Sequence, residues 1–156
     1  MRLHRRWLNR TDGESCRELH VQKRNPDRNS EDGKYAPAPP RCWEYTLEGG
    51  FRVYAGKTDA DNDQLSLRFA SPNDYWFHVK GMPGSHVILK VEDLTPDRDT
   101  LRQAAAIAAY HSKARAGGTV AVTMTLAKYV TKPRGAERGT VQLKQESTVK
   151  VKPSLP

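Results

Sequence analysis

The fold is decided by a stretch that reads YWFHVKGMPGSHVILKV over residues 75–91. Apolar and polar side chains alternate over 75–80, and apolar side chains dominate 86–91, so we expect each segment to form a strand. Residues 81–84 contain two glycines and a proline, which predicts the loop between the two strands. Alternate side chains of a strand face opposite sides, so Phe77 and its odd-numbered neighbours should share one face of the sheet.

The residues on the N-terminal side of this stretch add a hairpin and a helix. Alternation over residues 43–55 predicts two strands that turn at Gly49-Gly50. Residues 58–70 predict a short helix, because acidic residues crowd its first turn, where the helix dipole favours carboxylates. Leu65 and Phe69 are four residues apart and should therefore face the core together.

The residues on the C-terminal side begin with an alanine-rich helix. We expect Thr95 to be its N-cap and Pro96 to occupy its first position. The helix should continue until Gly117-Gly118, with Lys113 and Arg115 in its last turn.

The last third of the chain predicts three more strands. Alternating apolar residues indicate a long strand over 120–126, and a basic loop over 132–139 leads to a final hairpin of 141–145 and 148–152. The predicted fold class is therefore α+β, with one mixed, mostly antiparallel sheet packed with two helices.

Residues 1–42 differ in composition from the rest of the chain. They are rich in Arg, Asn, Asp, Glu and Ser and contain few residues that can build a core, so we expect a poorly ordered segment. Residues 35–40 read YAPAPP and predict an extended linker. We therefore expect a basic N-terminal segment, 1–42, followed by one domain, 43–156.

The sequence favours a cytoplasmic protein. No apolar run approaches the roughly 18 residues of a membrane span, and the basic start is not followed by the apolar stretch of a signal peptide. Cys16 and Cys42 lie far apart, which is typical neither of a disulfide framework nor of a zinc site and favours a reducing compartment. We expect no membrane partner, no cofactor and no metal ion.

The net charge of +8 is concentrated near the C-terminus. Residues 111–156 contain nine Lys or Arg and two Asp or Glu, whereas residues 43–110 contain seven and ten. Such a basic region can neutralise phosphates and release their counterions, which favours a nucleic-acid partner. The same charges would also suit a solvated surface, so composition alone leaves both interpretations open.

The run Gly56-Lys57-Thr58 matches the end of a phosphate-binding loop. That motif needs a glycine five positions before its second glycine, where this chain has Phe51. Asp59, Asp61 and Asp63 follow immediately and would repel a phosphate. The sequence therefore argues against nucleotide hydrolysis.

Two histidines flank the 81–84 loop. His78 and His86 could act as acid and base in RNA cleavage, because the histidine pKa lies near neutrality. A four-residue loop would pair Val79 with His86, whereas a five-residue loop would place both histidines on the same face. No cysteine or carboxylate stands beside them at metal-ligand spacing. Structural or RNA-contacting roles are the alternative.

A series of basic residues follows the second helix, with an aromatic residue interleaved. Lysine and arginine can hold a phosphate backbone while an aromatic ring stacks on an unpaired base. Helix-end charges would explain Lys113 and Arg115 equally well, but they explain the cluster in the 132–139 loop less well. The series comprises Lys113, Arg115, Lys128, Tyr129, Lys132, Arg134 and Arg138.

Several stretches resemble the NFACT-R domain, the RNA-binding domain of the NFACT proteins. They read GKTDADNDQL over 56–65, NDYWFHVKGMPGSHV over 73–87, and AAIAAYHSKAR over 105–115 followed by KYVTKPRG over 128–135. Their order and spacing match across roughly residues 43–156, and the second stretch is the most distinctive.

The resemblance implies RNA or ribosome binding. Full-length family members join stalled large ribosomal subunits, recruit tRNA and support untemplated tailing of nascent chains, and they carry further domains. Residues 1–42 are too short for those domains, so we expect a stand-alone NFACT-R protein without the tailing activity. Lys57-Thr58 stands where the family usually has Arg-Asn, and Glu137-Arg138 replaces a more usual Lys-Pro, which weakens the positive field of that loop.

The leading hypothesis is a non-enzymatic RNA-binding protein that acts on tRNA, ribosomal RNA or the large ribosomal subunit. The rival hypothesis is an RNA-processing enzyme that uses His78 and His86, and a third is a protein-interaction adaptor. The residues expected to contact RNA are Asn62, Asp63, His78, Lys80, Ser85, His86, Ser112, Lys113, Arg115, Lys128, Tyr129, Lys132, Arg134 and Arg138.

Overall fold

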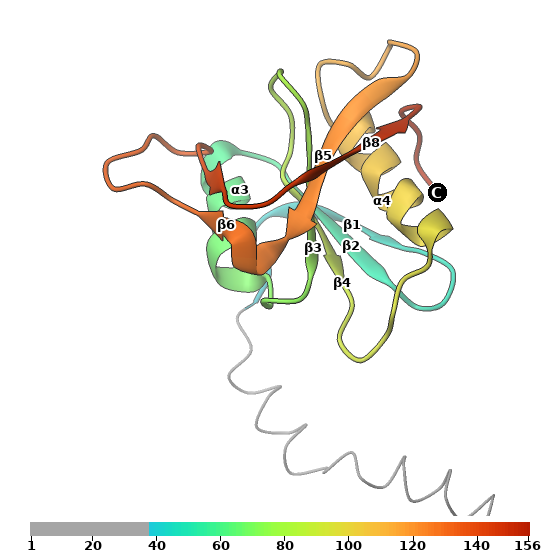
Figure 1. Cartoon of the computed structure of the whole chain (residues 1–156), viewed down its shortest axis with the longest axis horizontal. Coiled ribbons are helices and arrows are strands. Elements are labelled where there is room, and N and C mark those ends of the chain that lie inside the picture. The colour runs from blue at the N-terminus through green and yellow to red at the C-terminus, as the bar shows by residue number, and fades with distance from the viewer. Residues whose placement is uncertain (1–37) are drawn as a thin grey trace, which may run out of the picture. The chain divides into compact units, whose positions relative to one another are not determined.

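The structure is a computed structural model that describes residues 38–156 (Figure 1). The N-terminal segment, for which we expect poor order, and most of the linker lie outside the described residues. A six-stranded sheet in the order β1-β2-β4-β3-β5-β8 forms the centre of the described part, and every neighbouring pair is antiparallel. With the helices described below, this confirms the α+β class and the mostly antiparallel sheet.

The first hairpin is confirmed. Strand β1 (Cys42–Thr46) pairs with β2 (Arg52–Gly56). Gly49 and Gly50 adopt positive φ angles of 89° and 87° in the turn, a conformation that glycine adopts without a steric penalty.

The two strands of the fold-deciding stretch are also confirmed. Strand β3 (Tyr75–Val79) pairs with β4 (Val87–Lys90), and Phe77 lies opposite Val87. This register places His78 across from His86 on the same face, which is the second of the two alternatives.

Strand β5 and the chain that follows it correct one prediction. The long strand β5 (Val120–Leu126) is confirmed and pairs with β8 (Ser147–Val151) at the sheet edge. The predicted final hairpin is wrong, because β7 (Gln142–Leu143) instead pairs with β6 (Val130–Thr131) in a separate two-stranded sheet. The reason is packing: Leu143 joins the apolar cluster around Trp76, whereas Val151 joins the main core on the other face.

The first helix continues beyond its α-helical part. Helix α3 (Asp59–Gln64) is capped by Thr58, whose side chain accepts a hydrogen bond from the Asp61 nitrogen. A π-helical turn, Leu65–Phe69, then replaces the expected last α-helical turn. Leu65 is fully buried and Phe69 packs against the same cluster, so the prediction that both face the core is confirmed.

The second helix, α4 (Arg98–Tyr110), covers the main core, and both predicted ends are wrong. Asp97 caps it instead of Thr95, because the Asp97 carboxylate accepts hydrogen bonds from both the nitrogen and the hydroxyl of Thr100, each at 2.8 Å. The helix ends before Lys113 because the Ser112 hydroxyl donates to the Ala109 carbonyl and accepts from the Ala114 nitrogen.

The helices lie on opposite faces of the sheet. Alanines of α4 and Ile107 pack on Phe77 and Val79, while Leu65 packs with Trp76 and Ile88 on the other face. Within residues 38–156, none of the helices combines the length and the apolar character that crossing a bilayer requires.

Candidate nucleic-acid interface

The loop between β3 and β4 lies against the segment that follows α4. Gly84 and Ser112 form an isolated antiparallel bridge. The Ser85 nitrogen donates to the His111 carbonyl at 2.9 Å, and the Lys113 nitrogen donates to the Pro83 carbonyl at 3.2 Å. A side chain at position 84 would place its Cβ 2.8 Å from the Cβ of Ser112, so this approach requires glycine.

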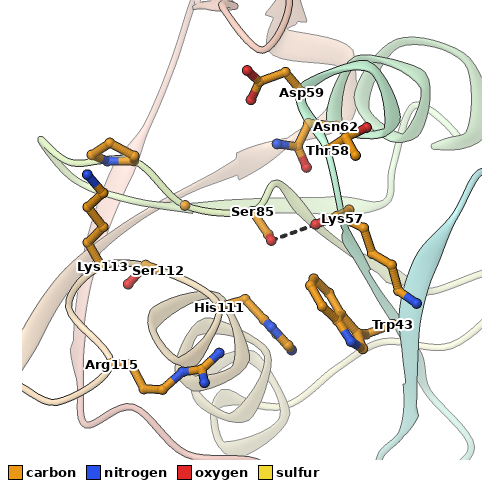
Figure 2. Close-up of a pocket in the computed structure, with 13 residues that line it drawn as sticks. Trp43, Lys57, Thr58, Asp59, Asn62, Ser85, His111, Ser112, Lys113 and Arg115 are labelled. Atoms are coloured by element: carbon orange, nitrogen blue, oxygen red, sulfur yellow. Dashed lines mark hydrogen bonds between the residues drawn. The ribbon is translucent and has the colours of Figure 1, made fainter.

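This contact forms one side of an open pocket with a volume of about 360 Å³, which we call the basic pocket (Figure 2). It brings together the strand β1, the start of α3, the β3–β4 loop and the segment after α4. Its lining residues are Trp43, Gly56, Lys57, Thr58, Asp59, Asn62, Pro83, Gly84, Ser85, His111, Ser112, Lys113 and Arg115.

Two of the predicted RNA contacts, Asn62 and Ser85, build the pocket wall, and the backbone of a third, His86, is bonded to it. Asn62, Ser85 and His86 are buried, with 5%, 9% and 3% of their surface exposed. The His86 nitrogen donates to Asn62 Oδ1 at 3.1 Å, and the Ser85 hydroxyl donates to the Gly56 carbonyl at 2.6 Å (Figure 2). These hydrogen bonds lie within the protein, so the Asn62 and Ser85 side chains fix the shape of the site.

The positive charge of the pocket comes from three exposed side chains, Lys57, Lys113 and Arg115, against one carboxylate, that of Asp59. Arg115 is held in place, because its Nε donates to the Tyr110 carbonyl at 2.7 Å and its guanidinium carbon lies 4.1 Å from the Tyr110 ring centroid. A fixed guanidinium in a pocket that is also lined by two lysines is suited to binding a phosphate.

An aromatic pair that the sequence analysis missed lies beside these cations. The Trp43 ring stacks on His111 with centroids 4.3 Å apart and an interplanar angle of 17°. His111 Nε2 is hydrogen-bonded to the Tyr45 hydroxyl at 2.6 Å, and Lys57 Nζ lies 5.3 Å from the Trp43 ring centroid. Trp43 nevertheless keeps 38% of its surface exposed. Burial, and secondarily the charge of Arg115, lower the pKa of His111 to about 4, so this ring is neutral at pH 7.

The two histidines of the rival hypothesis do meet, but in a buried cluster. The His78 and His86 rings lie 5.3 Å apart. The Trp76 indole donates to Ser66 Oγ at 2.9 Å, and the Ser66 hydroxyl is hydrogen-bonded to His86 Nδ1 at 2.8 Å. Burial lowers the pKa of His78, and burial followed by the proximity of His78 lowers that of His86 to about 4. His86 is therefore neutral at pH 7, and the lowered pKa of His78 also favours its neutral form.

The 132–139 loop is attached to α3. Lys132 Nζ lies 3.0 Å from Asp63 Oδ2 and also donates to the Glu137 carbonyl at 2.6 Å. The Gly139 nitrogen donates to Asp63 Oδ1 at 3.0 Å. Asp63 and Lys132, both expected to contact RNA, are thus engaged with each other.

The remaining predicted contacts lie outside the lining of the basic pocket. Lys128 is exposed, with Nζ 5.4 Å from the Tyr129 ring centroid. Among the predicted residues, the basic pocket therefore unites Asn62, Ser85, Ser112, Lys113 and Arg115. Those exposed elsewhere on the described surface are Lys80, Lys128, Arg134 and Arg138. Across residues 38–156, no cluster of three His, Cys, Asp or Glu side chains is arranged to hold a metal ion.

Comparison with known proteins places the chain within a family. The model of the NFACT protein RNA binding domain matches residues 42–145. The Rqc2 homolog RqcH of Bacillus subtilis (strain 168) is 37% identical over 128 residues, which cover 82% of this chain and 22% of that protein. The Rqc2 homolog RqcH of Streptococcus suis (strain 05ZYH33) is 37% identical over 107 residues, covering 69% of this chain and 19% of that protein.

A solved structure has the same fold. The C-terminal part of the fibronectin/fibrinogen-binding protein from Streptococcus suis superposes with a TM-score of 0.69 at 34% identity, and the match covers 76% of this chain and 47% of that one. This chain spans about a fifth of the length of the curated relatives it matches. Since the family model matches well over half of the chain, the chain belongs to the NFACT RNA-binding domain family.

Proposed function

We propose that this chain binds RNA through the basic pocket, and that it contacts tRNA, ribosomal RNA or the large ribosomal subunit in cytoplasmic quality control of translation. The observation that carries the proposal is the convergence of Lys57, Lys113 and Arg115 on one pocket beside an exposed tryptophan. Phosphate-binding cations next to an aromatic ring are typical of sites for unpaired RNA. Family membership supports RNA as the partner, and the RqcH relatives support the setting in translation.

The proposed role is binding without catalysis. A general acid must carry a transferable proton at the working pH and must reach the substrate. His86 is 3% exposed, and its Nδ1 is hydrogen-bonded to the Ser66 hydroxyl. Since burial lowers the pKa of both His78 and His86, the imidazolium that a general acid requires is disfavoured in this pair at pH 7.

The test is the salt dependence of RNA binding by the full chain. If roughly four to six phosphates are contacted, the affinity for single-stranded RNA should fall with salt along a log–log slope of about −3 to −4. The double variant Lys57→Gln, Lys113→Gln should bind more weakly and flatten this slope by about one for each lost contact.

A charge-matched control separates the pocket from overall charge. Arg98 and Lys152 are exposed, and Arg98 begins α4 while the pocket lies beyond the other end of that helix, about 18 Å away. The variant Arg98→Gln, Lys152→Gln has the same net charge as the pocket variant and should bind RNA almost as the wild type does. Equal losses in the two variants, or no RNA binding at low salt, would contradict the proposal.

A further inference from the structure

The basic pocket has an aromatic side and a cationic side. Figure 2 shows Trp43 and Lys57 at one side of the pocket and Lys113 with Ser112 at the opposite side. Asn62 comes from α3 and closes a third side. A ligand that fills this space meets the Trp43 ring with Lys57 beside it at one end and Lys113 at the other, which suits a nucleotide with its base at the ring and its phosphate at the opposite cation.

We propose that the basic pocket accepts a single unpaired nucleotide of an RNA strand, with its base stacked on Trp43 and its phosphate bound by Lys113 and Arg115. This inference rests on the proposed function, that the chain binds RNA, and adds which state of the RNA is recognised. The ligand is a base turned out of a strand, loop or end, and double-stranded RNA is excluded.

The stacking side of the pocket is organised before any ligand arrives. His111 covers one face of the Trp43 ring, and a hydrogen bond with Tyr45 holds His111 in turn. The Trp43 ring therefore loses little freedom when a base lies against it. Lys57 Nζ lies 5.3 Å from the Trp43 ring centroid, so this flexible side chain must move aside when a base stacks on the ring. Base stacking on an aromatic ring tolerates every sequence, because each base has a π-face. The pocket should therefore select for an unpaired base without strong preference for its identity.

The phosphate side is organised in the same way. The bond from Arg115 Nε to the Tyr110 carbonyl fixes the guanidinium, and its terminal nitrogens have no hydrogen-bond partner among residues 38–156. Two parallel N–H donors of a fixed guanidinium match two phosphate oxygens. Lys113 is anchored through its backbone to Pro83 while its ammonium stays exposed. The Asp59 carboxylate lies at a separate rim (Figure 2) and disfavours phosphate there.

The size and polarity of the pocket exclude a duplex. Its volume of about 360 Å³ is at the lower end of the range for small-ligand sites. In A-form RNA the bases are stacked inside the helix, so only a splayed-out base can enter a concave site. Asn62 adds a polar group for such a base, because its Oδ1 already accepts from His86 and its amide nitrogen has no partner within the described part of the chain.

The first experiment compares a 12-nucleotide single-stranded RNA with the same strand annealed to its complement, using fluorescence anisotropy with the full chain. The single strand should bind more tightly. Trp43→Ala should weaken binding of the single strand by roughly 5- to 100-fold, the loss of one stacked base. Trp43→Phe keeps a ring and should lose less, while the share of the RNA-induced fluorescence quenching that comes from Trp43 should disappear. Melting curves establish that both variants fold.

The second experiment is a double-mutant cycle between protein and RNA, with an abasic strand of the same length as the second RNA. Trp43→Ala should weaken binding of the intact strand and leave binding of the abasic strand unchanged. Equal losses on both strands, or equal affinity for duplex and single strand, would overturn the nucleotide pocket while RNA binding by the wild type remained. Absence of any RNA binding by the wild type would instead remove the proposed function itself.

Discussion

The side chains of Asp63 and Lys132 form an ion pair with 3.0 Å between Oδ2 and Nζ, although 69 positions separate them in the chain. The pair joins α3 to the loop that carries Arg134 and Arg138. Both partners are largely shielded from solvent, and the Lys132 ammonium also donates to two carbonyls of its own loop. Lys132 therefore holds the loop, whereas Arg134 is exposed to solvent.

We therefore expect substitutions of Lys132 and Arg134, two basic residues of one loop, to have different effects on stability and on RNA binding. Lys132→Gln should lower the free energy of unfolding by about 1 to 2 kcal/mol, because it removes charge-assisted hydrogen bonds. The matched control, Arg134→Gln, should stay within about 0.5 kcal/mol of the wild type and instead flatten the salt slope of RNA binding. Urea unfolding measures the first effect and anisotropy titration the second. Equal stability of the two variants would show that the ion pair does not hold the loop.

Gly56 should tolerate no side chain. A Cβ at this position would lie 2.1 Å from Asn62 Oδ1, the atom that accepts from the His86 nitrogen. Gly56→Ala should therefore cost about 2 to 3 kcal/mol of stability by overpacking the wall of the basic pocket. Gly118→Ala is the control, since no atom lies within 4 Å of its added Cβ, and its midpoint in urea should match or exceed that of the wild type. A Gly56→Ala protein as stable as the control would refute this account of the wall.

Stability should fall between pH 7 and pH 5. The pKa values of His86 and His111 lie at about 4 in the folded protein, below the ordinary 6.5. As the pH falls through 6.5 the unfolded chain takes up protons first, so stability is complete above that pH and is lost toward pH 4. Each residue should contribute a loss of about 2 kcal/mol between pH 7 and pH 5. Urea unfolding at the two pH values measures it, and His111→Gln should roughly halve the difference. A protein equally stable at both pH values would contradict the buried neutral histidines.

RNA should remain intact when it is bound. Stoichiometric wild-type protein should leave a labelled RNA uncleaved over hours, with or without divalent metal, because burial lowers the pKa of both His78 and His86 and disfavours the imidazolium that would act as general acid. Gel electrophoresis of the labelled strand measures this. Cleavage by the wild type that stops in His78→Ala would establish the rival enzymatic hypothesis.

The sequence predicted those parts of the fold that depend on local patterns. Alternation over 75–91 identified β3 and β4, and the alanine run identified α4. The helix start was wrong because Thr95 and Asp97 are both good caps, and only the position of Thr100 shows which one is used. The final hairpin was wrong because strand pairing is decided by which core each strand joins, and this is not a local property.

The candidate site was predicted only in part, for the same reason. Lys113 and Arg115 were identified by charge, and Asn62 and Ser85 by family resemblance, yet the latter two are buried in the wall. Trp43 was interpreted only as a strand residue, because the alternation of apolar and polar residues that begins with it fits β1 completely. Its exposure in the pocket depends on His111, which is distant in sequence and meets it only in the folded sheet.

The bridge between Gly84 and Ser112 also determines when the basic pocket can form during synthesis of the chain. The pocket is lined by residues from Trp43 to Arg115, and two of its three cations are among the last of them to be made. A nascent chain that has reached only β4 has neither the partner for Gly84 nor these cations. A newly made chain therefore has no complete pocket until α4 and the segment after it have left the exit tunnel and reached the sheet.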